Sequence, residues 1–126
     1  DSLKESGVVL SDADEIHNFK ALVETIVFDS DDTYLLQASD SGKRLIAESG
    51  GTIELPENLP KGFTVEVVQD SEEQVVFLAL DDAVLYSFGD FDATAGENAA
   101  VRLVVIRNTY NVSAEYNLAG NTGESA

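Results

Sequence analysis

The chain has 126 residues, and its 24 acidic residues outnumber its 7 lysines and arginines to give a formal charge of −17 at neutral pH. A chain of this length forms one domain, and its negative charge disfavours binding to nucleic acid or to an anionic membrane. The absence of cysteine excludes disulfides and thiolate metal sites, and no apolar run reaches the roughly 18 residues that a membrane span needs.

Residues 1–32 are predicted to form an N-terminal arm that anchors the protein. Within it we expect an arm over 1–10, a short helix over 12–22, and a strand over 23–28. Acidic residues at the start of the helix suit the positive end of its dipole, and β-branched residues favour the strand. The apolar residues that recur at helical spacing are Ile16, Phe19, Leu22, Val23 and Ile26.

Residues 33–120 have the pattern of an all-β domain, in which short apolar stretches alternate with turn residues. The sequence predicts a single small sandwich or barrel of about eight short antiparallel strands, with the arm before it and a flexible tail at 121–126. The predicted strands are 33–37, 43–48, 52–55, 63–69, 74–80, 83–88, 101–107 and 110–118.

Three local patterns refine this prediction. Gly50-Gly51 lies between strands 43–48 and 52–55, which favours a hairpin. The proline-bracketed segment 56–60 is expected to be a rigid connector, because proline lacks the N–H that a central strand needs. Segment 74–80 is almost wholly apolar, which is typical of a strand covered on both faces.

Catalytic and metal-binding patterns are weak. His17 is the only histidine, and no Gly-x-Ser-x-Gly turn is present, so we predict no catalytic residues, no cofactor and no enzyme activity. Two acidic clusters, Asp29–Asp32 and Asp90–Asp92 with Glu97, leave calcium open as an alternative. Both lack the spacing of a helix–loop–helix site, so solvated surface acids are the favoured interpretation.

The few basic residues are candidates for ion pairs within or between subunits, against the alternative of isolated surface pairs that contribute little. They are Lys43, Arg44, Arg102 and Arg107.

Four tyrosines are candidates for a sugar-binding surface, against the alternative of packed rings with hydroxyls at the sheet edge. They are Tyr34, Tyr86, Tyr110 and Tyr116.

Several motifs together resemble a family of small β domains in virion proteins of tailed bacteriophages. The matching stretches lie within residues 38–120, which is about two-thirds of the chain, and the most specific is Leu-Pro-Glu-Asn-Leu-Pro-Lys-Gly-Phe, in which two prolines precede an alternating strand. Residues 1–32 have no counterpart, residues 71–73 replace a glycine-containing turn, and Tyr116 replaces a tryptophan. The matching stretches are 38–46, 53–70, 74–77, 95–105 and 116–120.

The resemblance implies a structural or binding module, usually a homotrimer, with no catalytic residues. Our first hypothesis is a capsid decoration protein (a cement or head-fibre protein) that binds the major capsid protein on the outer surface of the head and reinforces it. The absence of a fibre or coiled-coil sequence favours the head. The expected shell-contact residues are Ile16, Phe19, Leu22, Val23, Ile26 and Phe28, and the expected intersubunit pairing residues are Lys43, Arg44, Arg102 and Arg107.

Two alternatives remain. A tail-fibre or spike module would bind host-surface carbohydrate, with Tyr86 and Tyr110 as candidates. A small enzyme such as a glycan hydrolase is the least favoured. Strands 74–80 and 101–106 are expected in the core and at the trimer interface.

Overall fold

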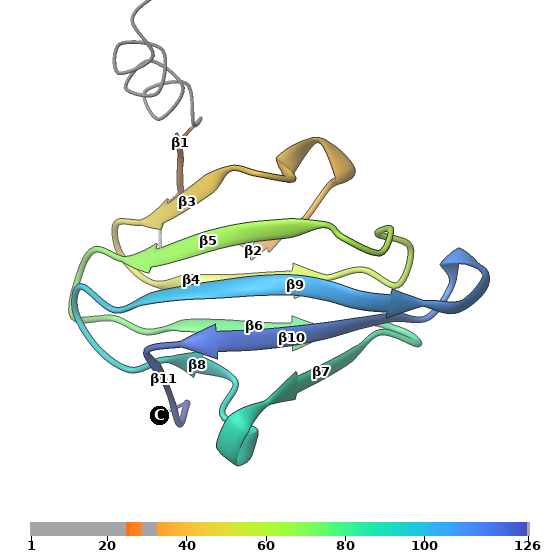
Figure 1. The fold of residues 1–126 in the computed structure, drawn as a ribbon. Helices are drawn as coiled ribbons and strands as arrows, with labels where there is room; N and C mark the ends of the chain where they lie inside the picture. Colours follow the sequence, from red (N-terminus) through yellow and green to blue (C-terminus); the bar gives the residue numbers. More distant parts are fainter. Residues whose placement is uncertain (1–24, 29–32, 126) are drawn as a thin grey trace, which may run out of the picture.

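The computed structural model describes residues 25–28 and 33–125. Within these residues the chain forms two packed β-sheets and three short 3₁₀ turns (Figure 1), which confirms the predicted all-β sandwich. The six-stranded sheet has the order β1 (Thr25–Phe28), β3 (Arg44–Ala47), β5 (Thr64–Gln69), β9 (Ala100–Asn108), β10 (Ala114–Gly120) and β7 (Val84–Ser87). The five-stranded sheet has the order β11 (Thr122–Gly123), β8 (Ala93–Thr94), β6 (Val75–Ala79), β4 (Gly51–Leu55) and β2 (Thr33–Leu35). The 3₁₀ turns are η1 (Ala38–Asp40), η2 (Phe88–Asp90) and η3 (Thr109–Asn111).

The chain crosses between the sheets with almost every strand. As a result β1, β3 and β5 are parallel neighbours in one sheet, and β2, β4 and β6 are parallel neighbours in the other. Strand β9 then pairs antiparallel with β5 and β10, and β7 runs parallel to β10 at the far edge. The prediction of antiparallel strands throughout is therefore wrong.

The predicted hairpin between 43–48 and 52–55 is also wrong, because β3 and β4 lie in different sheets. Gly50 and Gly51 adopt φ values of +83° and +124°, so the glycines do make the turn that the sequence indicates. The turn carries the chain across the core. Leu45 of β3 and Ile53 of β4 consequently enter the same core from opposite sides, and both are fully buried.

Alternation along the strands sets the two faces of each sheet. In β5, Val65, Val67 and Gln69 are buried while the residues between them are partly exposed. Strand β6 does not have the two covered faces predicted for 74–80: Val75 and Phe77 are buried, but Leu78 is 49% exposed. Each sheet thus has one face on the core and one outer face.

The link between β4 and β5 contains the two prolines, and its backbone carbonyls are bound by side chains from the last two long strands. The Tyr116 hydroxyl donates to the carbonyl of Pro56 at 2.5 Å. The Asn108 amide donates to the carbonyls of Glu57 at 3.1 Å and Leu59 at 2.7 Å. Leu59 is itself buried. The predicted connector is therefore fixed against the core by specific hydrogen bonds.

Residues 25–28 of the strand predicted over 23–28 form β1, whereas 23–24 lie outside the described residues. Residues 122–123 of the predicted flexible tail form β11 beside β8. The predicted helix over 12–22 lies outside the described residues. In the part of the chain that the structure describes, no helix is long and apolar enough to cross a membrane.

Candidate functional site: a basic surface on the six-stranded sheet

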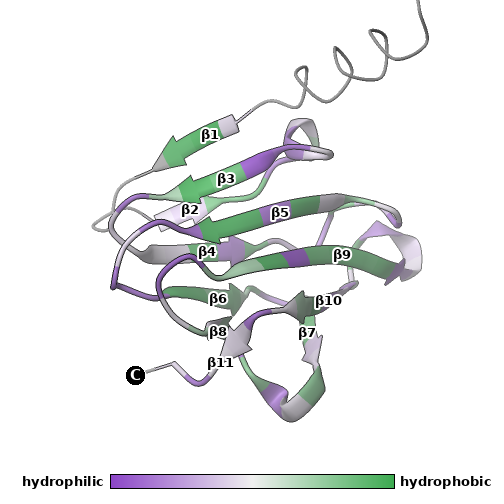
Figure 2. Cartoon of the chain, turned by 60° about the vertical axis from the view of Figure 1, so that its left-hand side comes forward, coloured by the Kyte–Doolittle hydropathy of each residue, from purple (hydrophilic) through white to green (hydrophobic). Residues whose placement is uncertain are grey.

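A row of charged side chains crosses the outer face of the six-stranded sheet. The register places Arg44 of β3 beside Glu66 of β5, and Glu66 beside Arg102 of β9. These positions face outward because their strand neighbours, such as Leu45 and Leu103, are fully buried. Figure 2 shows hydrophilic positions interrupting the hydrophobic colour of β3, β5 and β9.

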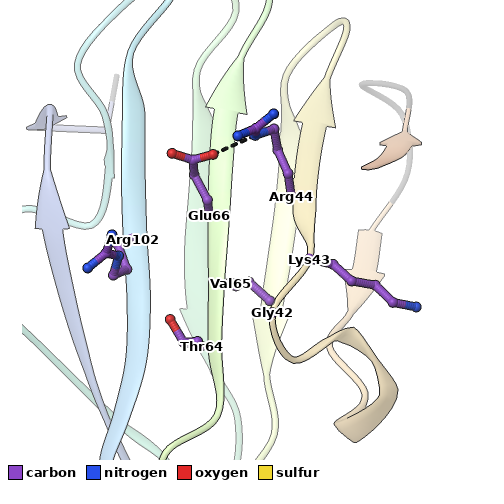
Figure 3. Close-up of a pocket in the computed structure, with 7 residues that line it drawn as sticks. All are labelled: Gly42, Lys43, Arg44, Thr64, Val65, Glu66 and Arg102. Atoms are coloured by element: carbon purple, nitrogen blue, oxygen red, sulfur yellow. Dashed lines mark hydrogen bonds and ion pairs between the residues drawn. The ribbon is translucent and has the colours of Figure 1, made fainter. Parts of the chain in front are cut away.

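This row borders a shallow depression of about 360 Å³. Its lining includes Gly42, Lys43, Arg44, Thr64, Glu66 and Arg102 (Figure 3). A second depression, of about 310 Å³, shares Glu66 and Arg102 and continues over β9 and β10 to Ala119 and Gly120. The two depressions therefore adjoin each other at Glu66 and Arg102, which line both.

The two arginines of the row differ in their bonding. The Arg44 Nε donates to Glu66 Oε1 at 2.6 Å, and both side chains are close to half exposed, so this ion pair contributes little to stability. Arg102 makes no side-chain hydrogen bond or ion pair with any residue in 25–28 or 33–125. Its planar guanidinium is free to bind a carboxylate or another oxyanion in a two-point geometry.

Lys43 extends from the same depression toward the edge of the sheet, away from Arg102 (Figure 3). Three of the four basic residues singled out from the sequence therefore line one depression, although Lys43 and Arg102 point in different directions.

Arg107 lies apart from this group. Its Nε and Nη2 donate to Glu115 Oε1 at 3.1 Å and 3.0 Å across the β9–β10 pair. The hydrogen bond and the charge of Glu115 raise the pKa of Arg107, and the charge of Tyr86 adds a smaller contribution in the same direction. Arg107 is therefore engaged within its own subunit.

The tyrosines divide into two pairs. Tyr116 is fully buried in the core, and the Tyr34 hydroxyl lies 3.0 Å from both carboxylate oxygens of buried Asp40. These two rings have structural contacts, as the packed alternative predicts. Tyr86 on β7 is 48% exposed, and Tyr110 at η3 is 89% exposed with φ at +57°, so this second pair is accessible to a ligand.

Most of the predicted shell-contact residues lie outside the described part of the chain: Ile16, Phe19, Leu22 and Val23. The side chain of Phe28 also lies outside it, although its backbone belongs to β1. Ile26 is partly buried against the core, so only part of its surface is accessible. Its neighbour Val27, which the sequence did not single out, is 52% exposed.

The sequence reasoning also missed Glu66 and Thr64 as members of the basic depression. Their outward positions in the alternating strand after Phe63 were a usable signal, but nothing in the sequence identified which strands lie beside β5. Among the residues described, no group of three or more histidines, aspartates and glutamates is placed to hold a metal ion. Asp29–Asp32 and His17 lie outside that part.

Comparison with protein-family models gave no match, and comparison with curated proteins gave none either.

Proposed function

We propose that this chain is a capsid decoration protein of a tailed bacteriophage, which binds the major capsid protein on the outside of the head. The observation that carries the proposal is the resemblance of its motifs to small phage virion domains, above all in the proline-bracketed link. The hydrogen bonds from Tyr116 and Asn108 give that link a structural role.

A decoration protein acts by adding contacts that must break before the shell opens. A standard interface of roughly 800 Å² per partner, repeated over many copies, adds substantial resistance to internal pressure. The sandwich offers a broad outer face on each sheet, and the N-terminal segment supplies the apolar residues for anchoring. The charge of −17 keeps free subunits apart in solution.

A homotrimer follows from the same resemblance, and the basic surface offers a contact for it. In each subunit Arg102 has no partner among the described residues, whereas acidic side chains are abundant. An ion pair from Arg102 to a neighbouring subunit is therefore favoured by charge, with Arg44 held in place by Glu66.

Purified virions of the virus that encodes the chain provide the test. We expect the protein in many copies spread over the head, with heads that lack it opening at lower temperature. Leu22→Ser should weaken binding to bare heads. The matched control Val112→Ser should not, because Val112 is an exposed residue at the β9–β10 turn. Absence of the protein from virions, or a strict monomer that binds no particle, would refute the proposal.

A second candidate function is recognition of host-surface carbohydrate by a tail module. It is favoured by Tyr110, a residue that is 89% exposed and has a left-handed backbone conformation, and by half-exposed Tyr86. Exposed aromatic rings of this kind are suited to stacking against sugar faces. Titration with host polysaccharide, compared with Tyr110→Ala and Tyr86→Ala, would detect such binding. A few copies located at the tail would favour this function over decoration.

A further inference from the structure

The outer face of the six-stranded sheet carries a row of side chains whose charge alternates from strand to strand. Arg44, Glu66 and Arg102 occupy register-matched positions on β3, β5 and β9, and Ala119 follows them on β10. Glu66 turns toward Arg44 and bonds its Nε (Figure 3). The order across the sheet is therefore positive, negative, positive and small, and the midpoint of the row lies between Glu66 and Arg102.

The rows on either side of the charged row are uncharged. Two residues along the strands, Val68 of β5 pairs in register with Ala100 of β9, and in the opposite direction Thr64 pairs with Val104. All four residues are partly exposed on the outer face. With two arginines and one glutamate, this part of the face has a local formal charge of +1, in a chain whose formal charge is −17.

This arrangement is self-complementary about a two-fold axis that is parallel to the strands and lies midway between β5 and β9. A second copy placed face to face about this axis puts Glu66 of each copy opposite Arg102 of the other. Each flanking row also meets its own counterpart, so Val68 of each copy lies opposite Ala100 of the other. Packed sheets are about 10 Å apart, a distance that a glutamate and an arginine together span.

The same rotation matches a projecting side chain to a depression. Strands β3 and β10 are equally far from the axis, so Arg44 of each copy lies opposite Ala119 of the other. Ala119 and Gly120 line the depression of about 310 Å³, because their side chains are too small to fill it. Arg44 is 46% exposed. It therefore enters the facing depression while its Nε stays bonded to Glu66.

We propose that this face is a two-fold interface between two copies of the chain, held by two equivalent ion pairs between Glu66 of one copy and Arg102 of the other. The contact joins the two acidic molecules through a surface of local positive charge, which reduces the repulsion between them. The inference does not depend on the capsid role. At this face it is an alternative to the homotrimer, and the mass of the complex distinguishes the two.

The size of the face sets the expected strength of the dimer. At a strand spacing of about 4.8 Å the six strands extend over about 24 Å. The six residues of β5 extend over about 20 Å. The footprint is thus roughly 500 Å² per copy, which is at the low end for specific interfaces. We therefore expect association in the micromolar range and rapid exchange between monomer and dimer.

Sedimentation equilibrium of the full chain, from low micromolar to millimolar concentration, measures this association. The average mass should rise with concentration from 13.5 kDa to about 27 kDa, twice that of one chain. A mass that stays at 13.5 kDa throughout overturns the inference. A mass three times that of one chain also overturns it, but supports the homotrimer of the proposed function.

Charge-reversal variants identify the facing residues. Glu66→Arg places two positive groups at each contact and Arg102→Glu places two negative ones, so each variant alone should remain a monomer. An equimolar mixture should form a mixed dimer, because both contacts then join opposite charges again. Circular dichroism of each variant reports whether it is folded. A mixture of folded variants that stays monomeric would show that Glu66 and Arg102 do not face each other.

A matched pair of variants separates this contact from the effect of net charge. Arg102→Gln and Leu78→Glu each make the chain more negative by one unit, and Leu78 is 49% exposed on the outer face of the other sheet. Arg102→Gln should weaken the dimer by about tenfold or more, since both ion pairs are lost. Leu78→Glu should leave the dimer almost unchanged. Equal weakening by the two variants would refute a specific interface on the six-stranded sheet.

Discussion

Replacing Thr94 by valine tests the polar link between the two sheets. Thr94 of β8 and Gln69 of β5 are both fully buried. The Thr94 hydroxyl donates to Gln69 Oε1 and accepts from the backbone N–H of Val75 at 3.0 Å. Gln69 in turn donates from Nε2 to the carbonyl of Ser71 at 2.8 Å. The hydroxyl therefore satisfies two buried groups at once, one from each sheet.

Valine has nearly the shape of threonine, so Thr94→Val removes the hydrogen bonds without opening a cavity. It leaves Gln69 Oε1 without its donor and the Val75 N–H without its acceptor. An unsatisfied buried polar group costs about 1–3 kcal/mol, so for the two groups together we expect a loss of roughly 2–6 kcal/mol in the free energy of unfolding. That is a large share of the total stability of about 5–15 kcal/mol that is usual for a domain.

Urea unfolding followed by far-UV circular dichroism measures this loss. Thr52→Val is the matched control: Thr52 lies on the outer side of β4, and no side-chain hydrogen bond to a described residue is found for it. Its unfolding free energy should change by less than about 0.5 kcal/mol. Equal midpoints for the two variants would refute the bonding described for Thr94.

Two further predictions concern the link and the first strands. Asn108→Ala removes three hydrogen bonds, two to the proline-bracketed link and one from the N–H of Ser113 at 3.0 Å. It should cost about 2–3 kcal/mol in urea unfolding, against less than about 0.5 kcal/mol for Asn117→Ala on the outer face of β10. Burial first, and then the hydrogen bond and charge of Asp40, raise the pKa of Tyr34 from 10.0 to about 12. Because the unfolded chain then loses the phenol proton first, this stabilisation is complete below pH 10 and is lost as the pH rises toward 12. The urea midpoint should therefore fall over this range, and Tyr34→Phe should make the fall shallower. An unchanged slope in Tyr34→Phe would contradict the assignment.

The strands themselves were largely predictable. The residues after Phe63 alternate, which indicates that Val65 and Val67 share one face, and that face is the core side of β5, because a strand with one buried face repeats every second residue. The same reasoning failed for β6, where an unbroken apolar run was interpreted as a doubly covered strand. Leu78 is instead half exposed, since an apolar composition alone does not decide which faces have neighbours.

The candidate site was predictable only in its parts. Lys43, Arg44 and Arg102 were recognised as unusual because basic residues are rare in this chain. Arg102 is far from the other two in sequence and reaches them only through the β3–β5–β9 pairing. Alternation after Phe63 indicated that Glu66 faces outward, but only the pairing of β5 with β3 and β9 places it between the two arginines.

The amino-acid sequence by itself determined the all-β class, most of the strand positions and the excess of negative charge, but not β8 (Ala93–Thr94), which lies between two predicted strands. Each of these follows from local rules, namely side-chain alternation, turn residues and composition. Only the tertiary structure decided that consecutive strands alternate between two sheets, so that β3 lies beside β5 instead of β4. A hairpin and a crossover bury the same residues of both strands and use the same glycines at the turn, so local energies do not distinguish them. The choice depends on how all strands pack together, and that choice places Arg44, Glu66 and Arg102 in one row.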